Sequence, residues 1–277
     1  MIKFDVKNRW TGEVAFTAEI DCAENETTSV KLGLAVMWAV KNKTSLAECD
    51  LAGANMARAD LSGAKLRRAD LTAANMTGAN MAVANLAGAN LADANLSGAD
   101  LREAKLSGVD LTGADLREAN LSGADLSWAD LTDSSLPWAN LTDANLTAAN
   151  LTAVNLREAK LVGANLWWAY MRRADLSGAD LTGAYMRRAD LTGAYMAGAY
   201  MAHTPVSFGP VGNSRRLCYA VFDAESAKIM VRMGCFWGDE KAAVKAVSEK
   251  YGPRSGYVSM VKAAVKVVKE YEKEKAQ

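Results

Sequence analysis

The chain has 277 residues, and its 32 Lys and Arg residues balance 32 Asp and Glu residues, so the formal net charge is zero. This balance gives no electrostatic bias toward nucleic acid or an anionic membrane, and we expect direct binding to neither. No apolar run reaches the roughly 18 residues of a membrane-spanning helix, and the first residues lack an apolar signal core. We therefore expect a cytoplasmic protein.

Cysteine and histidine, the residues needed for zinc binding and for Cys–His catalysis, are few and scattered. The four cysteines, Cys22, Cys49, Cys218 and Cys235, form no C-x-x-C pair, and His203 is the sole histidine. Zinc binding and Cys–His catalysis both need such residues in closely matched sets. We therefore expect reduced thiols, no metal, no cofactor and no catalytic residues.

Residues 1–43 are expected to form an N-terminal cap. Apolar and polar residues alternate in residues 2–6 and 14–20, which predicts two strands joined by a turn at residues 8–12. Residues 28–41 then carry apolar side chains at helical spacing. A β-hairpin followed by a helix is thus predicted to cover the first end of the central domain.

A five-residue repeat occupies residues 44–203. From Leu46 to Met201 every fifth residue is Leu or Met, at 32 consecutive positions, and the residue two places earlier is Ala in 27 of these 32 units. The residue between them is mostly Asp or Asn, and each Gly stands two places after Leu or Met. A period of five fits neither an α-helix nor a flat strand, so the chain must turn after every unit. Four units make a square coil with Leu, Met and Ala inside and about 4.8 Å between coils.

These A-[D/N]-L-x-x units resemble those of the pentapeptide-repeat family. The resemblance covers residues 44–203 and implies a mainly β fold, a right-handed quadrilateral β-helix of about eight coils. The family often places Phe at the central position, whereas this chain has none there, so its interior is predicted to be a ladder of Leu and Met. Some members of the family resemble B-DNA in shape and charge and bind type II topoisomerases.

Residues 204–277 are predicted to form a small C-terminal α+β module. We interpret residues 234–238 as a buried corner between a strand and a helix, because no charged side chain within them would activate Cys235. The expected elements are strands at residues 217–222 and 229–233 and helices at residues 239–251 and 257–275.

The C-terminal module is a candidate for homodimer formation, and capping of the solenoid or binding of a separate ligand are the alternatives. Similar modules occur on uncharacterised phage and prophage proteins, a resemblance that indicates a phage origin. An enzyme site there would rest on Cys235, Tyr219 and His203 alone. Direct nucleic-acid binding by the module is a further alternative, because it carries 13 basic and 8 acidic residues. These charges alternate along the predicted helices, however, which is typical of a solvated surface.

Residues 20 apart in the sequence are predicted to stack in one column on the outside of the solenoid. Trp128, Trp168 and Arg188 share such a column, so Arg188 is expected to lie over Trp168. Trp138 lies on the opposite face, and we expect both Trp128 and Trp138 to be partly exposed. Four tyrosines and Met201 are expected to pack beneath the C-terminal module; the tyrosines are Tyr170, Tyr185, Tyr195 and Tyr200.

The middle of the solenoid is acidic. Residues 86–155 carry ten acidic and three basic side chains, which is about two thirds of the charge density of duplex DNA over the same length. The leading hypothesis is a non-enzymatic protein–protein interaction scaffold that presents this acidic belt and exposed tryptophans to a protein partner. The alternative is a DNA mimic that modulates a nucleic-acid enzyme such as DNA gyrase. The candidate partner-binding residues are Trp128, Trp138, Asp110, Asp115, Glu118, Asp130, Asp133, Asp143, Glu158, Trp167 and Trp168.

Overall fold

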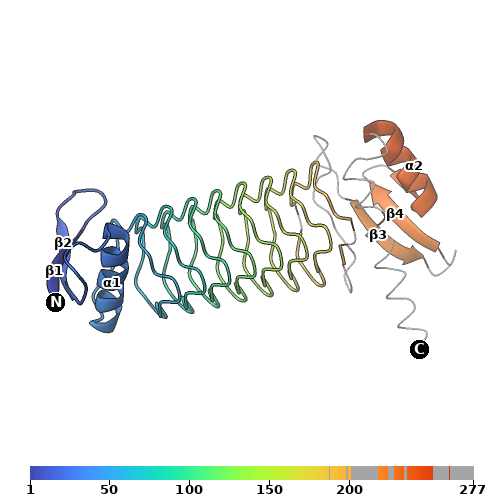
Figure 1. Ribbon diagram of the computed structural model, residues 1–277. Coiled ribbons are helices and arrows are strands. Elements are labelled where there is room, and N and C mark those ends of the chain that lie inside the picture. Colours follow the sequence, from blue (N-terminus) through green and yellow to red (C-terminus); the bar gives the residue numbers. More distant parts are fainter. Residues whose placement is uncertain are drawn as a thin grey trace, which may run out of the picture.

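A long four-sided solenoid follows an N-terminal hairpin and helix, and a small sheet with one helix belongs to the C-terminal part of the chain (Figure 1). The computed structural model describes residues 1–186, 188–197, 199–200, 218–223, 228–233, 236–251 and 262. Within these residues, no helix is both long and apolar enough to cross a membrane.

The N-terminal hairpin consists of β1 (Ile2–Lys7) and β2 (Val14–Ile20), which pair antiparallel with Ile2 opposite Ile20. Helix α1 (Thr28–Lys41) follows, and the side-chain oxygen of Thr27 accepts a hydrogen bond from the amide of Val30 at its N-terminus. The strands and the helix lie within one residue of the ranges that the sequence predicts. The division of the chain into three domains stays a prediction.

The hairpin and α1 provide backbone carbonyls to the first coil. The amide of Asp50 donates to the carbonyl of Lys7 at 2.8 Å, and the amide of Asn55 donates to the carbonyl of Ser29 at 2.9 Å. Helix α1 approaches so closely that a Cβ atom added to Gly33 would lie 1.8 Å from the carbonyl oxygen of Asn55. On two of the four walls, the cap therefore pairs backbone groups that an open sheet edge would leave without a partner.

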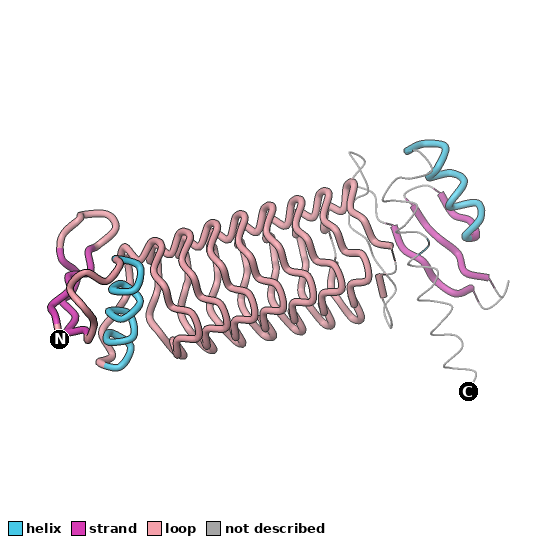
Figure 2. Tube along the Cα trace, in the orientation of Figure 1, coloured by secondary structure: helices cyan, strands magenta, loops and turns pink. Residues whose placement is uncertain are grey.

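The solenoid is held together by parallel pairing of residues that lie 20 positions apart, from Asp50 with Asp70 to Asp180 with Tyr200. Amide-to-carbonyl hydrogen bonds connect successive coils throughout, as in the 2.8 Å bond from Leu51 to Asp70. Each wall adds only one residue per coil to its ladder, so the solenoid is drawn as loop in Figure 2. The predicted square coil of four units is confirmed.

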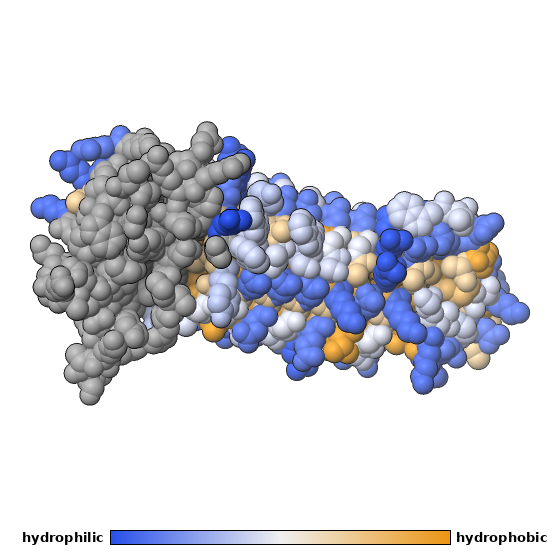
Figure 3. All heavy atoms as spheres, turned by 180° about the vertical axis from the view of Figure 1, so that it is seen from behind, coloured by the Kyte–Doolittle hydropathy of each residue, from blue (hydrophilic) through white to orange (hydrophobic). Residues whose placement is uncertain are grey.

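The interior consists of the central Leu and Met residues and the Ala residues that precede them. Every central residue from Leu46 to Met196 is at most 5% exposed. The side chains on the outside are chiefly polar, and Figure 3 shows mostly hydrophilic atoms over the visible face of the solenoid. The predicted Leu and Met ladder is confirmed for the described coils, and function must be sought on the outside.

The turns explain the other preferences of the repeat. In the turn that begins at Leu51, the amide of Ala54 donates to the carbonyl of Leu51, and Gly53 has a φ of +68°. The side chain of Asp50 accepts a hydrogen bond from the amide of Ala52 at 3.3 Å. Asp or Asn before the central residue therefore caps the turn, and Gly two places after it takes up the positive φ without strain.

The C-terminal part contains a three-stranded antiparallel sheet in the order β3-β4-β5 and a helix. Residues 236–238 are not the predicted corner; they belong to a third strand, in which Phe236 pairs with Met233 and Asp239 with Met230. The expected helix at 257–275 lies outside the described residues apart from Lys262. The elements are β3 (Cys218–Asp223), β4 (Lys228–Met233), β5 (Phe236–Asp239) and α2 (Glu240–Tyr251).

Candidate docking surface

One corner and one wall of the solenoid meet at its most exposed tryptophan. Each consists of residues that follow one another at intervals of 20 positions, one per coil. We call the first column the Trp128 corner: Gly108, Trp128, Ala148, Trp168 and Arg188. We call the second column the Asp130 wall: Asp110, Asp130, Asn150, Tyr170 and Asp190.

The tryptophans of the solenoid project into solvent. Trp128 is 74% exposed and Trp138 is 61% exposed, which confirms the predicted exposure of both. Trp167 and Trp168 are also exposed, although less so. Because the interior of the coil is already filled, these indoles contribute little to the stability of the fold and are free to contact another molecule.

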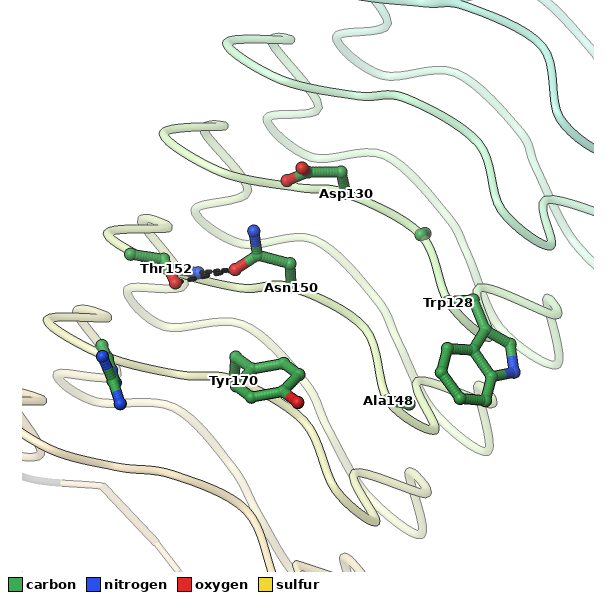
Figure 4. Close-up of a pocket in the computed structure, with 8 residues that line it drawn as sticks. Trp128, Asp130, Ala148, Asn150, Thr152 and Tyr170 are labelled. Atoms are coloured by element: carbon green, nitrogen blue, oxygen red, sulfur yellow. Dashed lines mark hydrogen bonds between the residues drawn. The ribbon is translucent and has the colours of Figure 1, made fainter. Parts of the chain in front are cut away.

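A hollow of about 380 Å³ lies where the Trp128 corner meets the Asp130 wall. Figure 4 shows the indole of Trp128 beside Ala148 at the corner, with Asp130, Asn150 and Tyr170 following one another along the wall. The hollow thus has the Trp128 indole on its corner side and the polar side chains of the wall, together with the ring of Tyr170, on the other. Three further residues contribute to its lining: Ala129, Thr152 and Arg172.

Both aromatic residues of the hollow depart from what the repeat prefers. Trp128 stands at the turn position with a φ of +61°, where glycine would be free of strain. Tyr170 occupies the position at which Asp or Asn caps the turn in most units, and a phenol cannot fold back to accept that hydrogen bond. Departures from local preference tend to mark functional positions, and here two of them share one hollow.

The charges around the hollow are unequally compensated. Asp130 accepts hydrogen bonds from the amide and the hydroxyl of Thr132, at 2.9 and 2.5 Å, but none of the ion pairs between described residues includes Asp130 or Asp110. The guanidinium of Arg172 donates to the carboxylate of Asp190 at 2.6 Å. Asp110 and Asp130 therefore keep their negative charge, whereas the charge of Arg172, which lines the hollow, is neutralised by Asp190.

Trp168 already carries a cation over its ring. The guanidinium carbon of Arg188 lies 4.5 Å from the ring centroid of Trp168, which confirms the predicted stacking of these two side chains. Trp167, the preceding residue, lines a second hollow of about 420 Å³ with Gly163, Asn165 and Tyr185 on the neighbouring wall. Aromatic side chains therefore flank this corner on both sides.

The remaining candidate residues do not join this surface. Trp138 stands half a coil away, on the opposite corner, and Glu118 and Glu158 precede and follow it in its own column. Asp133 lies at the far corner of the Asp130 wall, and Asp143 lies at another corner of the coil. The candidate residues thus form at least two separate surfaces.

Part of the acidic belt is internally neutralised. The carboxylate of Asp115 pairs with Arg117 at 2.6 Å, and that of Asp100 pairs with Arg102 at the same distance. The hydrogen bonds from these arginines, opposed by partial burial, hold the pKa of each carboxyl below its ordinary value. The free negative charge of the belt therefore lies at its other carboxylates rather than at Asp100 and Asp115.

The predicted packing of the tyrosines beneath the C-terminal module is wrong for three of them. Tyr170, Tyr185 and Tyr195 are between 52% and 66% exposed. The residue before the central Leu or Met points outward on every wall, and these three tyrosines belong to three different walls. Tyr200 is half-buried, and Met201 lies outside the described residues.

Sequence reasoning missed Asn150, Tyr170 and Arg172 as part of the site. The numbering contained the signal, since Tyr170 falls in the same column as Asp130, two coils later. What the columns alone did not give was the hollow between a corner and a wall, which depends on the size of every side chain around it.

No metal site is found among the described residues, and the buried Cys49 is not a reactive thiol. No group of three or more His, Cys, Asp or Glu side chains in this part of the chain could hold a metal ion. Burial, aided by the neighbouring Asp50, raises the pKa of the Cys49 thiol to about 11, which leaves it protonated and unreactive at neutral pH.

Comparison with known proteins supports the identity of the repeat. The family model described as pentapeptide repeats matches overlapping segments from residue 44 to residue 204. A search of curated proteins found no match. HetL, a pentapeptide-repeat protein involved in heterocyst differentiation regulation in the cyanobacterium Nostoc, is 34% identical over 56% of this chain and 78% of HetL, with a TM-score of 0.33. QnrB1, a plasmid-mediated fluoroquinolone resistance protein, is 22% identical over 53% of this chain and 78% of QnrB1, with a TM-score of 0.42.

The family match covers more than half of the chain, and the central Leu or Met of every unit from Leu46 to Met196 is buried in the coil. Proteins of this family form right-handed β-helices and are generally structural or interaction proteins rather than enzymes. The resemblance of the terminal modules to phage proteins stays a prediction. By its repeat, its 20-residue coil and its Leu and Met interior, the chain belongs to the pentapeptide-repeat family.

Proposed function

We propose that this protein is a non-enzymatic scaffold that binds a protein partner through the Trp128 corner and the Asp130 wall. The observation that carries this proposal is the pairing of Trp128 and Tyr170 in one hollow. Each replaces a residue that suits the turn better, and neither contributes to the interior. Large aromatic side chains beside a polar rim are the usual anchors of protein interfaces.

The test uses a variant that restores the preferences of the repeat, Trp128→Gly combined with Tyr170→Asn. Gly and Asn are what the repeat itself uses at these positions, so the fold is expected to be at least as stable as that of the native protein. We expect a partner that co-purifies with the native protein from its host to be lost with this variant. Trp138→Gly, which makes the same change at the opposite corner, is the matched control and should retain the partner.

Equal recovery of every co-purifying protein by the native chain and the double variant would refute the proposal. Loss of the partner with Trp138→Gly instead would move the docking surface to the opposite corner. Circular dichroism of each variant confirms that the coil is intact before the comparison is made.

The second candidate function is DNA mimicry, supported by the acidic excess of residues 86–155. Against it, basic side chains lie toward both ends of the solenoid, so the acidic excess does not extend over its whole length. A supercoiling assay with DNA gyrase tests this alternative directly. If the purified protein neither inhibits nor protects the enzyme, gyrase is excluded as its target.

A further inference from the structure

The chain contains its own example of a cation bound at the Trp128 corner. Arg188 follows Trp168 by one coil in the same column, and its guanidinium lies over the indole, with 4.5 Å between the guanidinium carbon and the ring centroid. Planar guanidinium groups stack on aromatic faces because the electron-rich face attracts positive charge. The spacing of one coil therefore suits a guanidinium stacked on an indole at this corner.

Trp128 occupies the same column two coils earlier, but its neighbour one coil later is Ala148. A methyl group stands where Arg188 stands for Trp168, and the space above it is part of the hollow. Trp128 is accordingly more exposed, at 74% against 45% for Trp168. Its indole has the geometry to receive a cation that this chain does not supply.

The wall beside Trp128 adds the complementary charge. Asp130 lines the hollow, and Asp110 lies one coil before it on the same wall. The ion pairs of the described residues leave both carboxylates unpaired with a base, whereas Arg172, on the far side, is engaged by Asp190. A guanidinium above Ala148 would thus meet an aromatic face beside a wall whose carboxylates are in no ion pair of the described residues, surroundings that suit the planar guanidinium of arginine.

We propose that the hollow between Trp128 and Tyr170 binds an arginine side chain of the protein partner. Its guanidinium stacks on the indole of Trp128, as Arg188 stacks on Trp168, and the negative charge of Asp130 and Asp110 on the adjoining wall attracts it. Tyr170, on the same wall, contacts the rest of the arginine-bearing segment. This inference rests on the proposed function and specifies the chemistry that the partner must present.

The test titrates the full-length protein, with fluorotryptophan in place of tryptophan, with three short capped peptides. Each has glycines around one central residue, which is arginine, lysine or the neutral isostere citrulline. Fluorine NMR reads every tryptophan separately, and Trp128→Phe and Trp138→Phe assign the two signals that matter. We expect the arginine peptide to shift the Trp128 signal and to bind about three- to tenfold more tightly than the citrulline peptide. The Trp138 signal reports separately on binding at the opposite corner, where Glu118 and Glu158 flank the indole, and its shift should be smaller than that of Trp128.

Two variants test the geometry. Ala148→Arg places a guanidinium within the chain at the site and should abolish the response of Trp128 to the arginine peptide. This variant is expected to fold, because Arg occupies the same turn position with positive φ at four other places in the solenoid: Arg58, Arg68, Arg173 and Arg188. Asp130→Asn should weaken binding about three- to tenfold without removing it.

Several outcomes would overturn the inference. These are no shift of the Trp128 signal, equal shifts with the arginine and citrulline peptides, or an unchanged response in Ala148→Arg. A shift caused by a neutral oligosaccharide such as cellotetraose, without one caused by the arginine peptide, would instead identify a carbohydrate site. If the peptides fail while partner capture from the host still depends on Trp128 and Tyr170, the proposed function stands and the arginine inference falls.

Discussion

Trp128 and Trp138 have the same backbone conformation but different neighbouring residues. Both follow a buried Leu by two positions, both have a φ close to +60°, and both are largely exposed. Trp128 has Ala148 beside it and opens onto a hollow, whereas Trp138 has a glutamate one coil before it and another one coil after it. The repeat thus dictates where a side chain projects, and the neighbouring columns decide what it can bind.

The interior should not distinguish the two corners. Leu126→Ala and Leu136→Ala each remove a fully buried side chain two residues before a tryptophan, and each should lower the free energy of unfolding by about 2–5 kcal/mol. The two losses should agree closely, because both leucines occupy equivalent places in the ladder. Chemical denaturation measures them, and a large difference would show that the corners are coupled to the core.

The turn should also treat the two corners alike. Trp128→Gly and Trp138→Gly each relieve a bulky residue of positive φ and should raise the free energy of unfolding by about 1 kcal/mol. Gly123→Ala, at the same position of a neighbouring unit, is the converse control and should be destabilising because its φ is +67°. Destabilisation by either tryptophan replacement would mean that the indole packs against the wall more than its exposure indicates.

The surroundings of Trp138 can be converted toward those of Trp168. Glu158→Arg places a guanidinium one coil after Trp138, in the relation that Arg188 has to Trp168. We expect a stabilisation of about 0.5 kcal/mol and a shifted fluorine signal of Trp138. Glu158→Gln, which removes the negative charge without adding a cation, is the control. If both variants change the stability and the Trp138 signal equally, the effect comes from removal of the glutamate charge and not from stacking of a guanidinium on the indole.

The smallest expected effect concerns the pH dependence of the Asp115–Arg117 pair. The hydrogen bond from Arg117 lowers the pKa of Asp115 in the folded protein, so the pair stabilises the fold at neutral pH. This contribution is lost as the pH falls below the ordinary carboxyl value, near 3.8, and through the lower folded value. Arg117→Gln should therefore lower stability slightly at pH 7, as expected for an exposed pair, and have no effect once Asp115 is protonated.

Stability measured across this pH range checks the expectation. Lys105→Gln removes a basic side chain that is in none of the described ion pairs, so its effect should not follow the titration of Asp115. A loss in Arg117→Gln that is equal at pH 7 and at pH 2 would contradict the electrostatic origin.

The sequence predicted those features that depend on period alone. Once residues 20 apart were assigned to one column, the buried ladder, the exposure of Trp128 and the stacking of Arg188 on Trp168 followed. The prediction for the tyrosines was wrong because it rested on the general expectation that aromatic side chains are covered, and not on the positions of these residues in the coil. The same numbering places three of them on open walls.

Other features depend on contacts that no period encodes. Strand β5 was missed because residues 236–239 were interpreted as a corner and the start of a helix, whereas they pair with β4, the strand directly before them in the sequence. The pairing of Arg117 with Asp115 depends on a side-chain conformation within one unit. The hollow at Trp128 depends on the small size of Ala148 and on Asn150 and Tyr170, which follow Trp128 by 22 and 42 positions in the sequence. Only the assembled coils bring these residues together.

The 20-residue coil also determines how such a surface can change in evolution. Gain or loss of one five-residue unit between Trp128 and Tyr170 would rotate Tyr170 by a quarter turn onto a neighbouring wall, with the Leu and Met interior unbroken. Gain or loss of four units would leave it on the same wall and shift it by one coil. Duplication of units can therefore assemble or dismantle a binding surface without any substitution of the residues that form it.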